Sequence, residues 1–194
     1  TPTITGSAEA GSTVEVFSSR SSNSLGTTTA DSSGSFSFTP SSSIGEGNHS
    51  ITAKATDAAG NTSSASSSLL ITVDTTAPTI RRVSVYTQDM ADELLKLGET
   101  IYIKVDFYEN VIVDTTSGTP TLELETGSTD RTALFNSVNS SSYDHYFSYT
   151  VQAGDTSSDL DYTSTSALSL NGGTFKDAAG NNANLTLPAP GAYN

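Results

Sequence analysis

Two short sequence words occur twice in this chain, each time in the same order. Pro-Thr-Ile stands at Pro2–Ile4 and again at Pro78–Ile80, and Asp-Ala-Ala-Gly-Asn stands at Asp57–Asn61 and again at Asp177–Asn181. A repeated order of this kind indicates modules of one general type in tandem. A chain of 194 residues is long enough for two such modules, each with a modest core.

Apolar and polar residues alternate in short runs between these words, and strict alternation buries one face of a strand while the other meets water. The predicted strands are 13–17, 35–38 and 50–55, then 101–107, 122–125, 147–151, 168–170 and 185–187. Turn signals between the runs favour antiparallel packing. The predicted fold class is all-β, with two tandem immunoglobulin-like antiparallel β-sandwiches over residues 1–77 and 78–194. Only Asp92–Leu97 carries a helical-turn signal.

The charge balance restricts the partners of the chain. There are 21 acidic and 8 basic residues, a formal net charge of −13, which repels nucleic acid and anionic lipid and suits divalent cations. Without cysteine, disulfides and thiolate metal sites are excluded. No apolar run approaches the roughly 20 residues that span a bilayer, so we expect no membrane insertion. The start at Thr1 lacks the features of a signal peptide, and we expect a piece of a longer protein.

Two interpretations of the Asp-Ala-Ala-Gly-Asn word remain open. The aspartate can accept backbone N–H bonds while the glycine takes a positive φ, which makes a well-formed hairpin turn. Alternatively, Asp57 and Asp177 also supply carboxylate oxygens to Ca²⁺, which takes 6–8 oxygen ligands in flexible geometry. The five residues alone do not decide between a turn and a calcium site.

Strand order makes the two copies of the word unequal. In an immunoglobulin order, the loop before the last strand and the loop after the second strand lie where the chain enters the domain. Asp74, Glu109 and Asp177, with Asn181 beside them, are then predicted to converge at the junction of the two domains. Three carboxylates without a cation repel one another, and a bound Ca²⁺ removes that repulsion. Asp57 is predicted to face a preceding module and to form an incomplete or empty site.

A second acidic cluster comprises Asp155, Asp159 and Asp161. In the same strand order it faces the far end of the second domain, near the acidic segment 89–93. Calcium binding at the junction with a following module is one interpretation of this cluster. The other is that Asp161 is a buried turn carboxylate that receives backbone N–H groups.

Beyond these patterns, the chain resembles a known family of surface proteins. The first domain is similar to bacterial Ig-like repeats, and the second is similar to the longer repeats of giant RTX-type, type I secreted adhesins. The segments that carry the resemblance are 2–16, 25–31, 34–38 and 57–61 in the first domain, and 109–111, 149–155, 159–162 and 170–181 in the second. Together they cover most of the chain, and their order is more specific than any one of them.

The resemblance implies a function outside the cell. It implies tandem extender repeats at a bacterial cell surface, stiffened by Ca²⁺, that project a ligand-binding end away from the cell. The implied partners are neighbouring Ig-like modules of the same chain and a host or environmental surface ligand, and we expect a monomer. Arg81 and Arg82, together with segments 88–97 and 136–145, depart from the pattern of the family.

Two other function classes compete with the extender. An enzyme is not expected, because His49 and His145 fall in different domains without a nucleophile pattern beside either. The alternative function is a ligand-binding module, for glycan or peptide, in the second domain. Tyr108, Tyr143 and Tyr146 are the side chains that could stack on a sugar.

Overall fold

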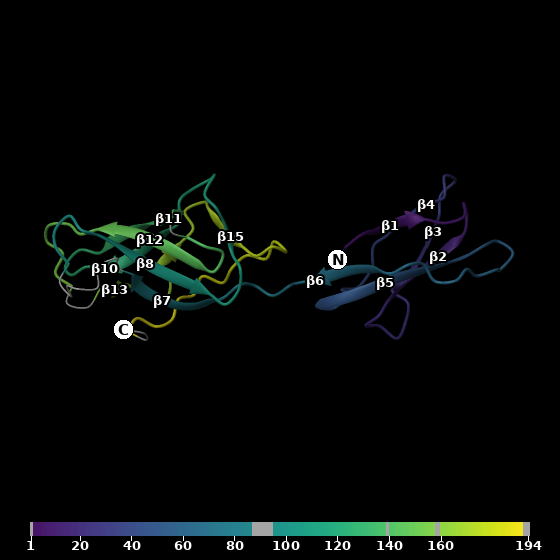
Figure 1. Ribbon diagram of the computed structural model, residues 1–194, viewed down its shortest axis with the longest axis horizontal. Helices are drawn as coiled ribbons and strands as arrows, with labels where there is room; N and C mark the ends of the chain where they lie inside the picture. Colours follow the sequence, from purple (N-terminus) through teal and green to yellow (C-terminus); the bar gives the residue numbers. More distant parts are fainter. Residues whose placement is uncertain (1, 87–94, 139, 158–159, 192–194) are drawn as a thin grey trace. The chain divides into compact units, whose positions relative to one another are not determined.

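The computed structural model describes residues 2–86, 95–138, 140–157 and 160–191 (Figure 1). The chain divides into two compact units, Thr1–Thr75 and Thr76–Asn194, so this division lies two residues before the predicted boundary. Strands are the regular elements of the described part, and no helix in it is long and apolar enough to cross a membrane. Residues 92–94 of the predicted helical turn at 92–97 lie outside the described residues, and residues 95–97 are not helical.

The first unit is a small antiparallel sandwich. Its strands are β1 (Ile4–Ser7), β2 (Thr13–Ser18), β3 (Gly26–Thr29), β4 (Ser35–Phe38), β5 (Gly47–Thr56) and β6 (Leu69–Val73). One sheet has the order β3-β2-β5-β6, and the other pairs β1 with β4. Val14 and Val16 on β2 are buried against Ile4 and Phe38 of the smaller sheet, which confirms the predicted alternation.

The second unit is a larger sandwich of the same kind. Its strands are β7 (Ile80–Tyr86), β8 (Thr100–Phe107), β9 (Ile112–Asp114), β10 (Thr121–Glu125), β11 (Arg131–Asn136), β12 (Asp144–Thr150), β13 (Asp161–Tyr162), β14 (Leu168–Ser169) and β15 (Thr174–Lys176). The main sheet runs β13-β10-β11-β12-β8-β7, with β14 also paired to β10. The short pair β9-β15 forms a separate sheet. The fold confirms the predicted class, all-β with antiparallel sandwiches.

The core of the second unit lies under the main sheet. Every second residue of β8 from Ile101 to Phe107 is buried, and Phe147 of β12 and Phe175 of β15 pack into the same cluster. Leu122 and Leu124 of β10 are buried while Glu123 and Glu125 are exposed, as alternation predicts. The burial of aromatic and branched side chains supplies most of the stability of a sheet of this size.

The predicted strand at 185–187 is wrong. Leu187 is buried, but the backbone N–H groups of this stretch do not form one ladder. The donors Ala183, Asn184 and Leu187 bond to Phe175, Pro78 and Thr165, which belong to three different segments. Alternation therefore identified a half-buried segment, and the lack of a single partner strand prevented it from becoming a strand.

Candidate metal centre

The first Asp-Ala-Ala-Gly-Asn loop follows β5 and is a closed hairpin turn. The backbone N–H of Asp57 donates to the carbonyl of Asn61 at 3.0 Å, and the N–H of Gly60 donates back to Asp57 at 3.1 Å. Oδ1 of Asp57 accepts the N–H groups of Ala59 and Asn61 at 2.9 and 2.8 Å, and Oδ2 accepts the Asn61 amide at 2.8 Å. These bonds, those from Asn61 above all, lower the pKa of the Asp57 carboxyl.

The second copy follows β15 and repeats this turn bond for bond. The Asp177 N–H donates to Asn181 at 3.2 Å, and Gly180 donates to Asp177 at 3.2 Å. The Asn181 backbone N–H and side-chain amide donate to Oδ1 and Oδ2 of Asp177 at 2.8 and 2.7 Å. The φ angles of Gly60 and Gly180 are 89° and 92°, so both glycines use the left-handed region that the turn requires.

The two copies differ in their surroundings. Asp177 is only 5% exposed, whereas Asp57 is half-buried and its hydrogen bonds lie in an exposed loop. Burial of Asp177 opposes ionisation, but the hydrogen bonds from Asn181 and the loop backbone outweigh burial and hold the pKa of this carboxyl below its usual range. The second loop therefore keeps a fixed, ionised carboxylate in a partly dry environment.

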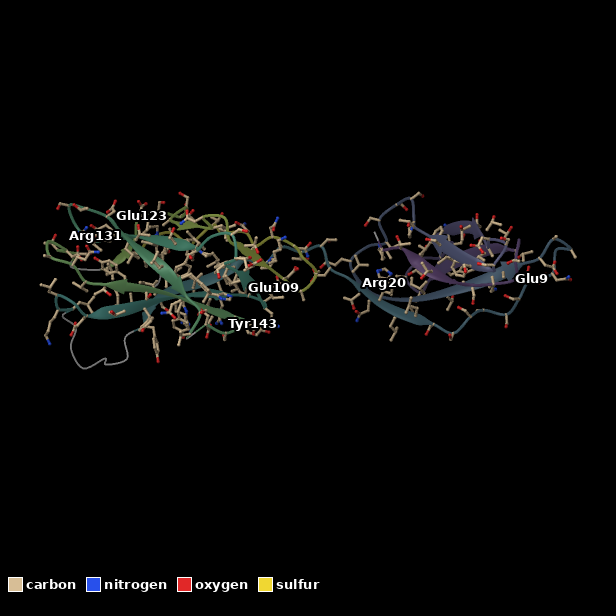
Figure 2. All side chains as sticks on the ribbon, turned by 90° about the horizontal axis from the view of Figure 1, so that it is seen from above. Glu9, Arg20, Glu109, Glu123, Arg131 and Tyr143 are labelled. Carbon is tan, nitrogen blue, oxygen red and sulfur yellow. The ribbon has the colours of Figure 1, made fainter. Side chains whose placement is uncertain are left out.

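One oxygen each of Asp74, Glu109 and Asp177 lies within 4.8 Å of the other two. Asp74 follows β6, Glu109 follows β8 and Asp177 follows β15, so three segments far apart in the sequence supply the group. Backbone bonds hold the loop after β8 in place, from Tyr108 to Thr79 at 3.0 Å and from Val111 to Ser142 at 2.7 Å. In Figure 2, Glu109 lies at one end of the second unit.

The chemistry of this group fits a hard divalent cation. Its donors are carboxylate oxygens, the ligands that Ca²⁺ prefers, and it contains neither His nor Cys. Three like charges within this distance repel one another, and a dication relieves that repulsion. A calcium shell needs 6–8 oxygen ligands, so three carboxylates do not complete it. Closest in the sequence, further oxygens are offered by the backbone carbonyls of the Asp177–Asn181 loop and by the side chain of Asn181. Asp57 is not part of any such group among the described residues.

Two of the remaining predicted ligands, Asp155 and Asp161, have protein partners. Asp155 accepts Arg131 Nε at 3.1 Å on Oδ1, and on Oδ2 the Gln152 N–H at 2.7 Å and the Tyr149 hydroxyl. Asp161 accepts backbone N–H groups from Tyr162 at 2.8 Å and from Gly191, which matches the turn-carboxylate interpretation.

These residues do not form a second acidic group in the described structure. Asp159 and the segment 89–93 lie outside the described residues. Within the described ranges, Asp155 and Asp161 belong to no cluster of side chains that could hold a metal ion. Arg131, which bonds to Asp155, lies at the end of the second unit opposite to Glu109 (Figure 2). Calcium at this second cluster stays a prediction.

A charged network on the main sheet was missed by the sequence analysis. By the alternation of the predicted strand 101–107, Asp106 stands on the outward face, yet it is only 4% exposed. Arg82 donates to its Oδ2 through Nε at 3.0 Å and through Nη2 at 2.7 Å, and Lys104 Nζ lies 3.0 Å from its Oδ1. The signal was available in part, since Arg82 stood out as a departure from the family and Lys104 shares the face of Asp106 by alternation.

Comparison with known proteins bears mainly on the first unit. Residues 1–75 match the family model described as a bacterial Ig-like domain, which confirms the predicted type for this unit. No curated protein matches the sequence. Among solved structures, one similar chain comes from a study of host cell surface retention of a 1.5-MDa bacterial ice-binding adhesin, at 18% identity and a TM-score of 0.35. The match covers 92% of this chain and 53% of that one, so this chain spans about half the length of the matched chain.

Proposed function

We propose that this chain is a non-enzymatic structural segment of a bacterial cell-surface adhesin, whose tandem sandwiches act as an extender stiffened by Ca²⁺. The match of residues 1–75 to a bacterial Ig-like domain and the tandem β-sandwich architecture support an extracellular spacer. The observation that carries the calcium part is the group of Asp74, Glu109 and Asp177. The partners of the proposed extender segment are neighbouring Ig-like modules of the same chain. The projected end of the adhesin binds a host or environmental surface ligand.

The proposed action of the ion is mechanical. Asp74 belongs to the segment that leads into the second unit, whereas Glu109 and Asp177 follow strands of that unit. A cation bound by all three ties the linking segment to the second sandwich and removes the bending freedom of a short flexible connection. Such a segment gains stiffness from extracellular calcium without a disulfide, which this chain lacks.

Calorimetric unfolding of the full chain in millimolar calcium and in EDTA tests the proposal. Extracellular calcium modules bind with Kd of roughly 10⁻⁴–10⁻³ M. Binding at 100 Kd stabilises by about 2.7 kcal/mol, and we expect the melting temperature of the second unit to rise by on the order of 10 °C. Small-angle scattering should show less bending in calcium than in EDTA.

A matched pair of variants makes this test specific. Asp177→Asn removes one charge from the acidic group, whereas Asp57→Asn makes the same change in an equivalent turn outside any such group. We expect Asp177→Asn to abolish the calcium-dependent rise in melting temperature and Asp57→Asn to keep it. Equal melting temperatures of the unaltered chain in calcium and in EDTA would falsify the proposal.

A further inference from the structure

The outward face of β7, β8 and β12 carries a compact set of aromatic and charged side chains. These strands are neighbours in the main sheet (Figure 1). Val83, Val105 and Phe147 point into the core, so the residues between them face outward. Cross-strand neighbours on this face form three rows: Arg82, Asp106 and Asp144; Ser84, Lys104 and Tyr146; and Tyr86, Tyr102 and Ser148.

The row of Arg82, Asp106 and Asp144 contains an unfavourable pair of like charges. Asp106 and Asp144 are direct cross-strand partners, and like charges in that position destabilise a sheet. Burial raises the pKa of Asp144, and its neighbour Asp106 raises it further. Arg82 and Lys104 balance the two carboxylates. A local conflict that the fold does not require is typical of a functional surface.

The same row presents polar groups to solvent in fixed positions. Asp106 is buried and holds the Arg82 guanidinium by bonds from Nε and Nη2, and within the described ranges the N–H groups of Nη1 remain for another acceptor. The side chains of Arg82 and Asp144 are 43% and 39% exposed. Two planar groups, one a donor and one an acceptor, therefore stand on one rigid face.

An aromatic corner adjoins this row. The rings of Tyr86 and Tyr146 are 5.6 Å apart at an interplanar angle of 72°, and Tyr86 is 44% exposed. Tyr102 is the cross-strand partner of Tyr86. Tyr146 is the cross-strand partner of Lys104, whose Nζ lies 3.0 Å from Oδ1 of Asp106, so the aromatic corner adjoins the charged row. Apolar ring surface and fixed polar groups thus share one small patch.

The size and the charge of the patch indicate its ligand. Neighbouring strands are about 4.8 Å apart, so the three strands span roughly 10 Å, the scale of one or two sugar rings. Two positive and two negative side chains balance, which favours a neutral ligand over a phosphate or a metal ion. A protein partner needs about 800 Å² with an apolar centre, whereas the middle of this patch is the charged side chain of Lys104.

We propose that the outward face of β7, β8 and β12 binds a neutral carbohydrate. Tyr86 and Tyr146 pack against the C–H face of a pyranose ring, and Arg82 and Asp144 exchange hydrogen bonds with its hydroxyl groups. Asp106 acts as a positioning residue for Arg82. The site is independent of calcium, because it shares no residue with the acidic group of Asp74.

Affinity electrophoresis of the full chain in EDTA tests this site. The gels contain dextran, galactomannan or hydroxyethyl cellulose as neutral polysaccharides, and alginate as an acidic one. We expect retardation by at least one neutral polysaccharide that persists when the salt rises from about 0.05 M to about 0.5 M, because no net charge drives binding. Retardation by none of the neutral polysaccharides, or by alginate alone, overturns the proposal.

Tyrosine variants locate the site. Tyr86→Ala should weaken retardation by about tenfold, the loss expected for one aromatic contact. Tyr86→Leu keeps an apolar side chain on the strand but removes the ring, and should lose as much. Ile112→Ala removes another exposed apolar side chain, on β9 of the separate two-stranded sheet, and should change nothing. Equal losses in Ile112→Ala and Tyr86→Ala, with both variants folded by circular dichroism, overturn the assignment.

Discussion

The side-chain amide of Asn181 donates a hydrogen bond of 2.7 Å to Oδ2 of Asp177. Together with the backbone bond to Oδ1, it fixes the carboxylate in one orientation. The same bond joins Asn61 to Asp57 at 2.8 Å in the first unit, where the described residues provide no acidic group. The chain therefore contains its own control for separating the turn from the proposed calcium site.

Asn181→Ala is expected to weaken calcium binding without removing a charge. Groups that orient a metal ligand typically contribute about 10–100-fold to affinity, and the lost bond to an ionised, buried carboxylate costs the second unit about 1.5–3 kcal/mol. Calcium titration by calorimetry measures the first effect, and thermal unfolding in EDTA measures the second. Asn61→Ala should leave calcium affinity unchanged, and a matching loss there would show that the acidic group is not the site.

Asp155→Asn is expected to destabilise the second unit whether or not calcium is present. The carboxylate bonds to Arg131, the Gln152 N–H and the Tyr149 hydroxyl, and its side chain is only 9% exposed. Removing the charge leaves Arg131 without its ion-pair partner, at a cost of about 2–3 kcal/mol. The measurement is the free energy of unfolding in calcium and in EDTA. A loss confined to calcium would instead make Asp155 a ligand.

The same variant has a spectroscopic readout. Burial raises the pKa of Tyr149 to about 12, and the bond to Asp155 contributes to the increase. Asp155→Asn should therefore bring the pKa of Tyr149 down towards that of an ordinary tyrosine. Ultraviolet difference titration follows the ionisation, with Tyr149→Phe identifying which tyrosine changes. An unchanged titration would show that the hydrogen bond is not formed in solution.

We expect the buried imidazole of His145 to make the stability of the second unit depend on pH. Its imidazole is 2% exposed, lies 5.4 Å from the ring of Phe175 and 5.5 Å from that of Phe107, and neither ring nitrogen has a hydrogen-bond partner among the described residues. Burial alone lowers the pKa of His145 to about 4. In the unfolded chain His145 has an ordinary pKa of about 6.5. Between the two pKa values, the unfolded chain therefore binds a proton at His145 that the folded unit does not bind.

The second unit should lose about 3 kcal/mol as the pH falls from 6.5 to 4, because the unfolded state binds more protons in that window. Above pH 6.5 this stability is fully present. Asp106, Asp155 and Asp177, whose pKa values are lowered in the folded state, add their own loss only at lower pH, as the carboxyl groups protonate. Urea unfolding at a series of pH values measures the slope.

His145→Phe isolates this effect. The ring of phenylalanine fits among the neighbouring aromatic side chains and carries no titratable group, so the loss of stability between pH 6.5 and 4 should disappear. The raised pKa of Asp144 should then leave only a slope of the opposite sign near the acid end of this window, because the folded state binds that proton more readily than the unfolded state. The slope at lower pH should remain, because the carboxylates are unchanged. An unaltered slope in the upper window would assign the pH dependence to other groups.

Local sequence patterns were sufficient to predict the strand faces. Alternation placed Ile101, Ile103 and Leu122 correctly, because a half-buried strand repeats every two residues whatever its partners are. Strand order also predicted which loops share an end of the second domain, and one oxygen each of Asp74, Glu109 and Asp177 lies within 4.8 Å of the other two, while Ca²⁺ binding by them stays a prediction. Both expectations depend on backbone geometry, which sequence signals report directly.

Side-chain partners could not be predicted in the same way. Asp106 stands at an outward position, and only the register of β7 against β8 brings Arg82 beside it and buries it. Asp155 was predicted as a possible ligand because it lies in an acidic stretch, yet Arg131, 24 residues away, bonds to it. Cross-strand register depends on the whole sheet, so a single strand carries little information about it.

Gly118 and Gly180 separate two reasons for a glycine in this fold. A Cβ at Gly118 would lie 1.7 Å from the carbonyl oxygen of Asn171, so Gly118→Ala requires a backbone shift and should destabilise the second unit by about 3 kcal/mol or more. A Cβ at Gly180 meets nothing within 4 Å, and only its φ of 92° opposes a side chain. Gly180→Ala should therefore cost about 1–2 kcal/mol.

Gly60 provides the control, with a φ of 89° and the same open surroundings. Gly60→Ala should destabilise the first unit by about as much as Gly180→Ala destabilises the second, because the two turns have the same hydrogen bonds. Urea unfolding of the three variants in EDTA gives the free energies. If Gly118→Ala costs no more than the turn variants, the close approach of Gly118 to Asn171 does not persist in solution, whereas a larger loss identifies this contact as the more demanding constraint.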